Sequence, residues 1–253
     1  MKKLFLYILP VFFAGAVSAQ QTFIAKGKIE FEKKISIHKA LDAIVGDDEG
    51  EATWIAQLKK SLPAYKNVYF DLYFSGDKTL YQPGREDNAP QKTPDWALGP
   101  ANDNIIYSDL SKGESISQKT VYEATYLIQD SIRNIKWRIT PDTRTIAGLE
   151  CRKAVGVIMD SVYVIAFYSE QILTTGGPES FSGLPGMILG VAIPRINTTW
   201  FATKLELQEV KPEQLVAPKK GKKTDNKTLL TQLNASTKDW GKNGKRNVWC
   251  VML

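Results

Sequence analysis

The sequence predicts a mainly β protein built on a single antiparallel sheet, with one or two short helices. Hydrophobic residues make up 43% and charged residues 24% of its 253 residues, which is typical of a globular protein and excludes a disordered or fibrous one. Apolar and polar residues alternate with a period of two along much of the chain, as in strands with one buried face. These stretches follow one another closely, so we expect turns rather than crossover helices between them.

The first nineteen residues have the pattern of a cleavable export signal. Two lysines precede an apolar run from Leu4 to Val17, and small residues end the segment at Ala19. The run is too short to cross a bilayer, although an N-terminal membrane anchor is the alternative. We therefore expect residues 1–19 to be a signal peptide, and we expect no transmembrane span in the mature chain.

Strand patterns begin directly after this segment. In residues 23–37 the odd positions are mostly apolar, while Lys28, Glu30, Glu32 and Lys34 occupy even ones. This alternation predicts a long strand with one buried and one solvent-exposed face. Residues 67–74 alternate in the same way and lead into a Ser-Gly-Asp hairpin turn. Further strands are expected at 78–81, 104–110, 116–122, 124–130, 135–140, 143–157, 161–169, 187–193 and 198–210.

Two stretches interrupt the strand pattern. Residues 46–63 place Trp54, Ile55, Leu58 and Leu62 on one stripe, with acidic residues at the start and lysines at the end, which predicts a helix. We expect this helix to cover one face of the sheet. Residues 82–104 contain four prolines and no periodicity, so we expect a long loop, a feature that is usually functional or disordered.

The chain's positive charge belongs to its C-terminal part. Residues 211–246 contain ten Lys or Arg against three acidic residues. We expect an antiparallel β domain over residues 20–210, followed by a basic, flexible segment over 211–253 with a short helix at 228–235 and a C-terminal tail. A solvated loop is the simpler interpretation of the basic residues, and a contact for anionic head groups or glycans is the other. Nucleic acid is not an expected partner, because no aromatic residues interleave with the charges.

The two cysteines, Cys151 and Cys250, leave two alternatives open. An exported protein meets oxidising conditions, so a disulfide between them is one alternative, and two unrelated buried thiols are the other. The lone histidine, His38, has no cysteine or acid at a metal-ligand spacing. We therefore expect no catalytic residue, metal site or cofactor, although a pair of carboxylates acting in a hydrolase stays open.

Residues 183–188, with the sequence Gly-Leu-Pro-Gly-Met-Ile, form a turn ahead of a strand. Pro185 fixes φ and Gly186 permits a positive φ, so residues 184–187 are expected to form a type II turn, and Gly186→Val to destabilise the protein. A rigid turn between strands is one interpretation and a ligand contact is the other. The candidate binding residues are Gly183, Leu184, Pro185, Gly186, Met187 and Ile188.

The hexapeptide resembles the signature of the GLPGLI family, exported proteins of Gram-negative bacteria, with Met187 in place of the signature's leucine. Residues 135–140, 146–154, 167–168 and 177–181 follow the order of that family's other motifs. The resemblance implies a periplasmic or outer-membrane-associated protein. It also implies a curved half-barrel sheet with helices in its concave side, similar to lipoprotein-localisation carriers. It assigns no catalytic residues.

We therefore expect an exported, non-enzymatic protein that binds an apolar ligand, a lipid or an envelope partner such as an outer-membrane transport protein. A carboxylate-dependent secreted hydrolase and a purely structural envelope protein are the alternatives.

Overall fold

The computed structural model describes residues 23–43, 49–87 and 93–253. The expected signal peptide, residues 1–19, lies outside the described residues. The strands are β1 Lys26–Ser36, β2 Tyr65–Ser75, β3 Lys78–Pro83, β4 Ile105–Asp109, β5 Glu114–Val121, β6 Ala124–Ser131, β7 Arg138–Ile146, β8 Leu149–Ile158, β9 Val162–Ser169, β10 Met187–Ile193, β11 Thr198–Glu206 and β12 Lys222–Thr224. The helices are α1 Ile37–Asp42, α2 Glu49–Ser61, α3 Asp95–Leu98, α4 Asn226–Ser236 and α5 Gly241–Val251, with 3₁₀ turns η1 Pro194–Ile196 and η2 Pro212–Gln214.

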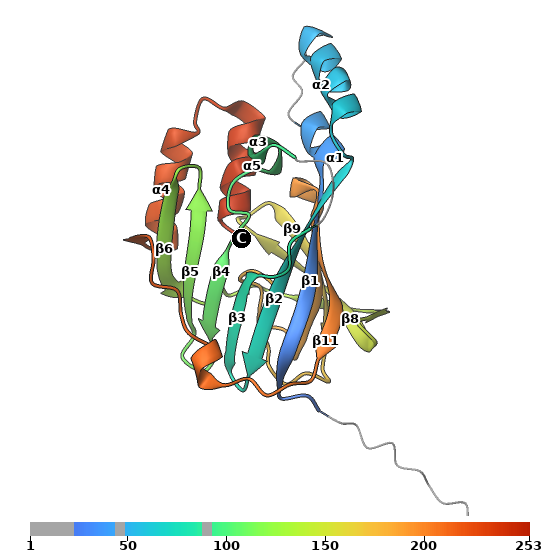
Figure 1. The fold of residues 1–253 in the computed structure, drawn as a ribbon, viewed down its shortest axis with the longest axis vertical. Coiled ribbons are helices and arrows are strands. Elements are labelled where there is room, and N and C mark those ends of the chain that lie inside the picture. The colour runs from blue at the N-terminus through green and yellow to red at the C-terminus, as the bar shows by residue number, and fades with distance from the viewer. Residues whose placement is uncertain (1–22, 44–48, 88–92) are drawn as a thin grey trace, which may run out of the picture.

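All twelve strands belong to one sheet in the order β12-β6-β5-β4-β3-β2-β1-β11-β10-β9-β8-β7. The pairs are antiparallel except for the short β12, which runs parallel to β6. The sheet curls, so that β8 and β9 lie behind the front strands in Figure 1, and it stays open because β7 and β12 do not pair. The predicted fold class, a mainly β protein with one curved, open sheet, is confirmed.

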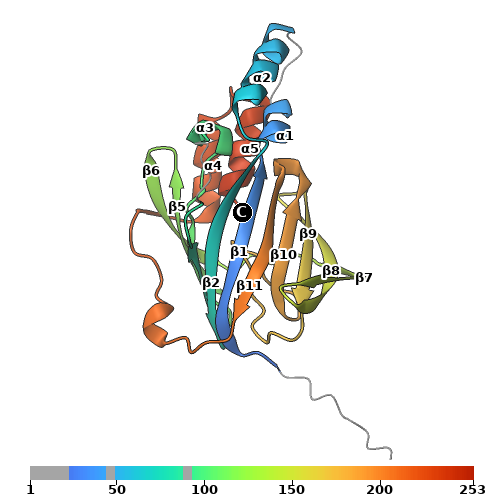
Figure 2. The ribbon, with the colours of Figure 1, turned by 45° about the vertical axis from the view of Figure 1, so that its right-hand side comes forward.

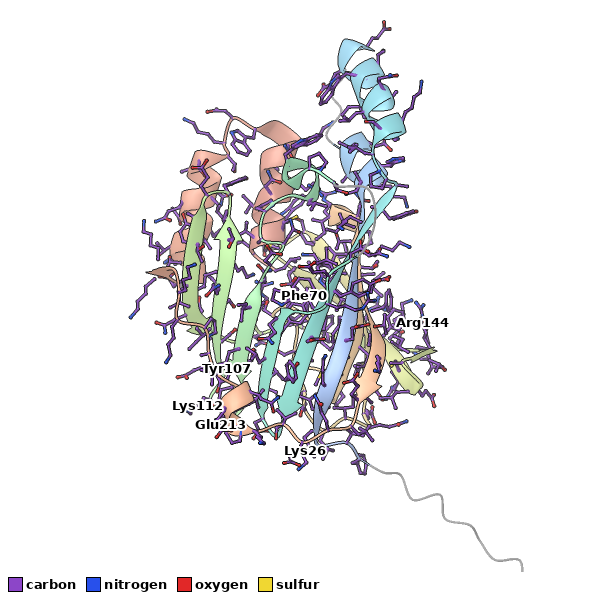
Figure 3. The ribbon with its side chains drawn as sticks, viewed as in Figure 1. Lys26, Phe70, Tyr107, Lys112, Arg144 and Glu213 are labelled. Carbon is purple, nitrogen blue, oxygen red and sulfur yellow. The ribbon has the colours of Figure 1, made fainter. Side chains whose placement is uncertain are left out.

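The alternation in the sequence sets which face of each strand points inward. Ile29 and Phe31 of β1 are fully buried, whereas Glu30 and Glu32 between them are partly exposed. Phe31 pairs with Phe70 of β2, so the apolar positions of both strands share the inner face. Figure 3 shows Phe70 in the middle of the sheet.

The protein's own side chains fill the concave side of the sheet. One core cluster joins β1 to β4 with β8 to β11, and the segment 172–184 adds Ile172, Phe181 and Leu184 to it. A small pocket beside β5 and β6 has a volume of about 30 Å³ and a largely polar lining. The core side chains thus occupy the concave side of the sheet, where the resemblance implied helices and a lipid-carrier-like fold.

The helix α2 lies where the sequence predicts a helix, but its expected place on the sheet is wrong. It extends beyond the end of the sheet (Figures 1 and 2), and Trp54 on it is 56% exposed. Ile55, Leu58 and Leu62 pack instead with α1 and α3 in a small separate cluster. The apolar stripe is thus buried against neighbouring helices. Sequence periodicity shows that a helix has an apolar face but not whether a sheet or another helix covers it.

Two C-terminal helices cover the inner face of the sheet. Leu229 of α4 and Val251 of α5 pack with Val121 of β5 and Ile128 of β6. The predicted short helix is confirmed as α4, whereas α5 occupies a stretch where only a tail was expected. Leu253 joins the main core, so the basic segment completes the sheet's interior. No helix among the described residues is long and apolar enough to cross a membrane.

Candidate functional site

The Gly-Leu-Pro-Gly-Met-Ile hexapeptide forms a turn between the segment 172–184 and β10. Gly183 and Pro185 are exposed, and the other four residues are buried. The positive φ expected at Gly186 is present, at +144°. The type II turn is wrong, because the Gly186 N–H donates to the Leu184 oxygen at 2.8 Å and closes a three-residue turn around Pro185.

Contacts of this turn are those of a packing element. A Cβ on Gly186 would lie 2.1 Å from the Ser169 oxygen, so only glycine lets the turn lie against the end of β9. Trp137 donates from Nε1 to the Ser182 oxygen at 2.9 Å and lies beside Gly183. These contacts favour the interpretation as a rigid inter-strand turn.

The two cysteines are free thiols in different surroundings, so the disulfide alternative is not realised in this structure. Burial raises the pKa of Cys151 to about 11. Burial also raises the pKa of Cys250, and the charges near it are those of Arg246, Lys33 and Glu179. Both thiols therefore stay protonated at neutral pH and are poor nucleophiles.

His38 has a structural contact at the start of α1. Its Nε2 lies 3.1 Å from the Leu62 oxygen, which ties α1 to the end of α2. Among the described residues, no three His, Cys, Asp or Glu side chains gather closely enough to hold a metal ion.

An open cleft of about 620 Å³ lies near α3 and α5, at one end of the inner face of the sheet. We call it the aromatic cleft, because Trp96, Tyr122 and Trp240 line it. Its other lining residues are Lys66 and Val68 of β2, Leu98 of α3 with the following residues 99–103, Thr120 of β5, and Asn243 and Asn247 of α5. Segments far apart in the sequence therefore meet here.

The three aromatic side chains of the cleft are unusually exposed. Trp96 is 54%, Tyr122 49% and Trp240 47% exposed, although the protein buries most of its large apolar residues. The rings of Tyr122 and Trp240 meet edge to face, with centroids 5.6 Å apart. Such a cluster of exposed rings is typical of a binding surface.

Tyr122 is held in place by its backbone and by a hydrogen bond. Its φ of +55° is uncommon for a bulky residue and belongs to the tight turn between β5 and β6. Asn247 donates from Nδ2 to the Tyr122 hydroxyl at 3.2 Å. Burial raises the pKa of Tyr122, so its hydroxyl keeps a proton that it can donate to a ligand.

Asn102 connects the cleft to a buried charged cluster beneath it. Its Nδ2 donates to the Gly99 oxygen at 2.5 Å, and its Oδ1 accepts from Lys33 Nζ at 3.5 Å. Lys33 Nζ lies 3.6 Å from Glu179 Oε1, and both side chains are almost fully buried. Asn104 donates to the other oxygen of Glu179 at 2.7 Å. The floor of the cleft thus rests on a buried ion pair, in which Lys33 donates to Asn102 and Glu179 accepts from Asn104.

Aromatic rings also surround this ion pair. Lys33 Nζ lies 5.4 Å from the ring centre of Trp200 and 5.8 Å from that of Phe70, within cation–π range. Tyr81 lies in the same interior, where burial and then the charge of Glu179 raise its pKa well above the usual value. The cluster is therefore a fixed part of the core beneath the cleft.

Sequence reasoning missed both members of the ion pair. Lys33 occupies an odd position between Phe31 and Ile35, on the strand face that is otherwise apolar. A lysine on a buried face needs a buried partner, so this break in the alternation could have indicated the ion pair. Glu179 lies in an irregular segment, at a φ of +52°, and no sequence pattern marks it.

A second buried cation, Lys119 of β5, anchors the end of the chain. It donates from Nζ to the Val251 oxygen at 2.9 Å and to the Leu253 oxygen at 2.7 Å. Arg133 donates to the Met252 oxygen beside it. Burial lowers the pKa of Lys119 to about 8, with Arg133 and Lys33 adding to the shift and Glu179 opposing it.

The lowered pKa of Lys119 predicts a rise in stability at high pH. Between about pH 8 and 10.5 the unfolded chain still binds the proton that folded Lys119 has released, so the free energy of unfolding increases with pH. The gain across this range is about 3 kcal/mol relative to Lys119→Met, which lacks the group. Urea unfolding of both proteins from pH 7.5 to 10.5 measures it, and parallel curves would contradict it.

Comparisons with known proteins agree with the fold and leave the activity open. Residues 110–190 match the model of a family described as a protein of unknown function, Porph_ging. That stretch runs from the end of β4 into β10 and includes the hexapeptide. The GLPGLI name is not confirmed, but a family of unknown function is consistent with it. No curated protein matches the chain.

Two solved structures of PNGF-II are similar in fold. The one in space group C2 has a TM-score of 0.50 at 14% identity and covers 86% of this chain. The one in space group P2₁ has a TM-score of 0.48, also at 14% identity and 86% coverage. This chain spans about a third of PNGF-II, 33% and 34% of the two chains. The first likeness supports the curved sheet and says nothing about activity.

Proposed function

We propose that the protein is an exported, non-enzymatic binding protein that holds its ligand in the aromatic cleft. The observation that carries this proposal is the group of three half-exposed aromatic side chains around an open cleft of about 620 Å³. Small-molecule sites have volumes of this order and combine apolar walls with a few polar groups. Export rests on the signal pattern of residues 1–19.

The described lining of the cleft favours binding over catalysis. Asp103 supplies its one carboxylate, and no histidine or cysteine lines it. A glycosidase-type hydrolase needs two carboxylates facing a shared cleft. Glu179 beneath the floor has a fully buried side chain and is bound by Asn104, so it is not placed to meet a substrate.

A ligand in this cleft approaches from outside, at the end of the sheet. This differs from the expected lipid or apolar ligand inside the concave sheet, where the protein's own core side chains pack. The buried ion pair below Asn102 supports the floor, so the cleft is formed before a ligand binds.

Replacing Trp240 by alanine is expected to weaken ligand binding at least about tenfold, because exposed aromatic anchors dominate the binding energy of such sites. The measurement titrates ¹⁵N-labelled protein with indole, benzyl alcohol and methyl glucoside at millimolar concentration and follows the indole N–H signals. The signals of Trp96 and Trp240 should shift and that of Trp54 should not.

Trp54→Ala is the matched control, since Trp54 is at least as exposed as Trp240 but lies on α2. It should leave binding unchanged. Equal shifts at Trp54 and Trp240, or equal losses in both variants, would show that the compounds bind exposed tryptophans without a site and would contradict the proposal.

A further inference from the structure

The hydrogen-bonding groups of the aromatic cleft suit a ligand whose groups both donate and accept. Asn243 lines the cleft, and its side chain offers an amide N–H and an amide oxygen. The Tyr122 hydroxyl already accepts from Asn247, so its own proton is left for a ligand oxygen. Hydroxyl groups of a ligand satisfy both partners at once.

The exposed rings of the cleft suit a ligand with flat faces of C–H groups. Tyr122 and Trp240 meet at an interplanar angle of 66°, so their exposed faces point in different directions. Aromatic faces attract C–H surfaces by dispersion, and a sugar ring carries such a face with hydroxyls around its edge. A Pro-rich peptide, by contrast, lies along aligned aromatic ridges and offers mainly carbonyl acceptors.

The lysines beside and beneath the cleft are paired with carboxylates. Lys66 pairs with Asp87 at 2.9 Å, and Lys33 pairs with Glu179 below the floor. Arg246, only 6% exposed, lies beneath Gly99, while exposed Asp103 lines the opening. Among the described residues that line the cleft, Lys66 is the one cation and it is paired with Asp87, which favours an uncharged ligand over a nucleic acid or an acidic polymer.

We infer that the aromatic cleft binds a neutral oligosaccharide of two or more sugar rings. This inference rests on the proposed binding function and names its ligand class. The cleft volume lies in the middle of the range for ligand sites, and three separate aromatic residues give more than one ring a surface to pack on. The amide and hydroxyl groups between them fix the orientation of the bound sugar.

The experiment titrates the protein with neutral trisaccharides containing α- and β-linked glucose, mannose, galactose and N-acetylglucosamine. Calorimetry gives the affinity, and the indole N–H signals of Trp96 and Trp240 give the location. We expect at least one trisaccharide to bind about tenfold more tightly than its monosaccharide. Trp240→Ala should lower that affinity at least tenfold, and Asn243→Ala severalfold, with Trp54→Ala unchanged.

Three further arms separate failure of this inference from failure of the proposed function. If a Pro-rich decapeptide or indole shifts the Trp96 and Trp240 signals and no saccharide does, the cleft is a binding site and the carbohydrate assignment is overturned. If trigalacturonate binds tenfold more tightly than every neutral trisaccharide, the uncharged assignment is overturned. If no probe shifts these signals, the proposed function falls as well.

Discussion

Replacing Gly186 by alanine is expected to lower the free energy of unfolding by about 3 kcal/mol or more, and valine should cost more still. The added Cβ would lie 2.1 Å from the Ser169 oxygen and 2.7 Å from the Ser169 carbonyl carbon, so backbone at the end of β9 must move. The φ of +144° adds strain, because side chains rarely adopt it.

Gly76→Ala is the matched control for this prediction. Gly76 also has a positive φ, +55°, but no heavy atom lies within 4 Å of the position that an added Cβ would take. Its substitution should cost only about 1 kcal/mol, which is the strain of the backbone conformation alone. Urea unfolding of both variants measures the difference, and equal losses would show that the close approach to Ser169 is not a constraint.

Replacing Glu179 by glutamine is expected to cost about 3–5 kcal/mol, because it leaves the Lys33 ammonium buried without a carboxylate. Lys33 and Lys119 both lie in the field of Glu179, so the loss affects two buried cations. Lys33→Met should be less costly, since Asn104 still donates to the remaining carboxylate.

The ion pair between Lys112 and Asp109 provides the control, because its lysine is exposed and the buried Asp109 carboxylate still accepts from the Ser111 hydroxyl and the Lys112 backbone N–H. The Lys112 side chain is 66% exposed and lies at the end of the sheet away from the helices (Figure 3), so Lys112→Met should cost less than about 1 kcal/mol. A double-mutant cycle of Lys33→Met and Glu179→Gln measures the coupling by urea unfolding. If the losses in unfolding free energy are additive, Lys33 and Glu179 do not interact as proposed. A loss for Glu179→Gln no larger than that for Lys112→Met would contradict the prediction as well.

The strands and the glycine turn could be predicted because their signals are local. The inner face of β1 follows from residues two apart, and a positive φ at Gly186 follows from the Pro-Gly pair. The hydrogen bond of that turn did not follow, because its closure depends on packing against Ser169 of another strand. The place of α2 did not follow either, since an apolar stripe does not say which surface covers it.

The candidate site, too, depends on contacts that local sequence patterns do not predict. In the sequence, Tyr122 belongs to an expected strand and Trp240 to the basic C-terminal segment, and no pattern connects them. Only the curl of the sheet brings them together with Trp96. Asn102 lies in a loop whose length predicts function, but its contact with Lys33 needs a strand 69 positions earlier.

A mainly β chain with one buried strand face follows from local sequence alone, because alternation within a strand is fixed by backbone geometry between near neighbours. The burial of Lys33 against Glu179 and the open aromatic cleft above them come from long-range packing. Both depend on contacts between residues far apart in the chain, which form only when the sheet curls and α5 packs against its inner face.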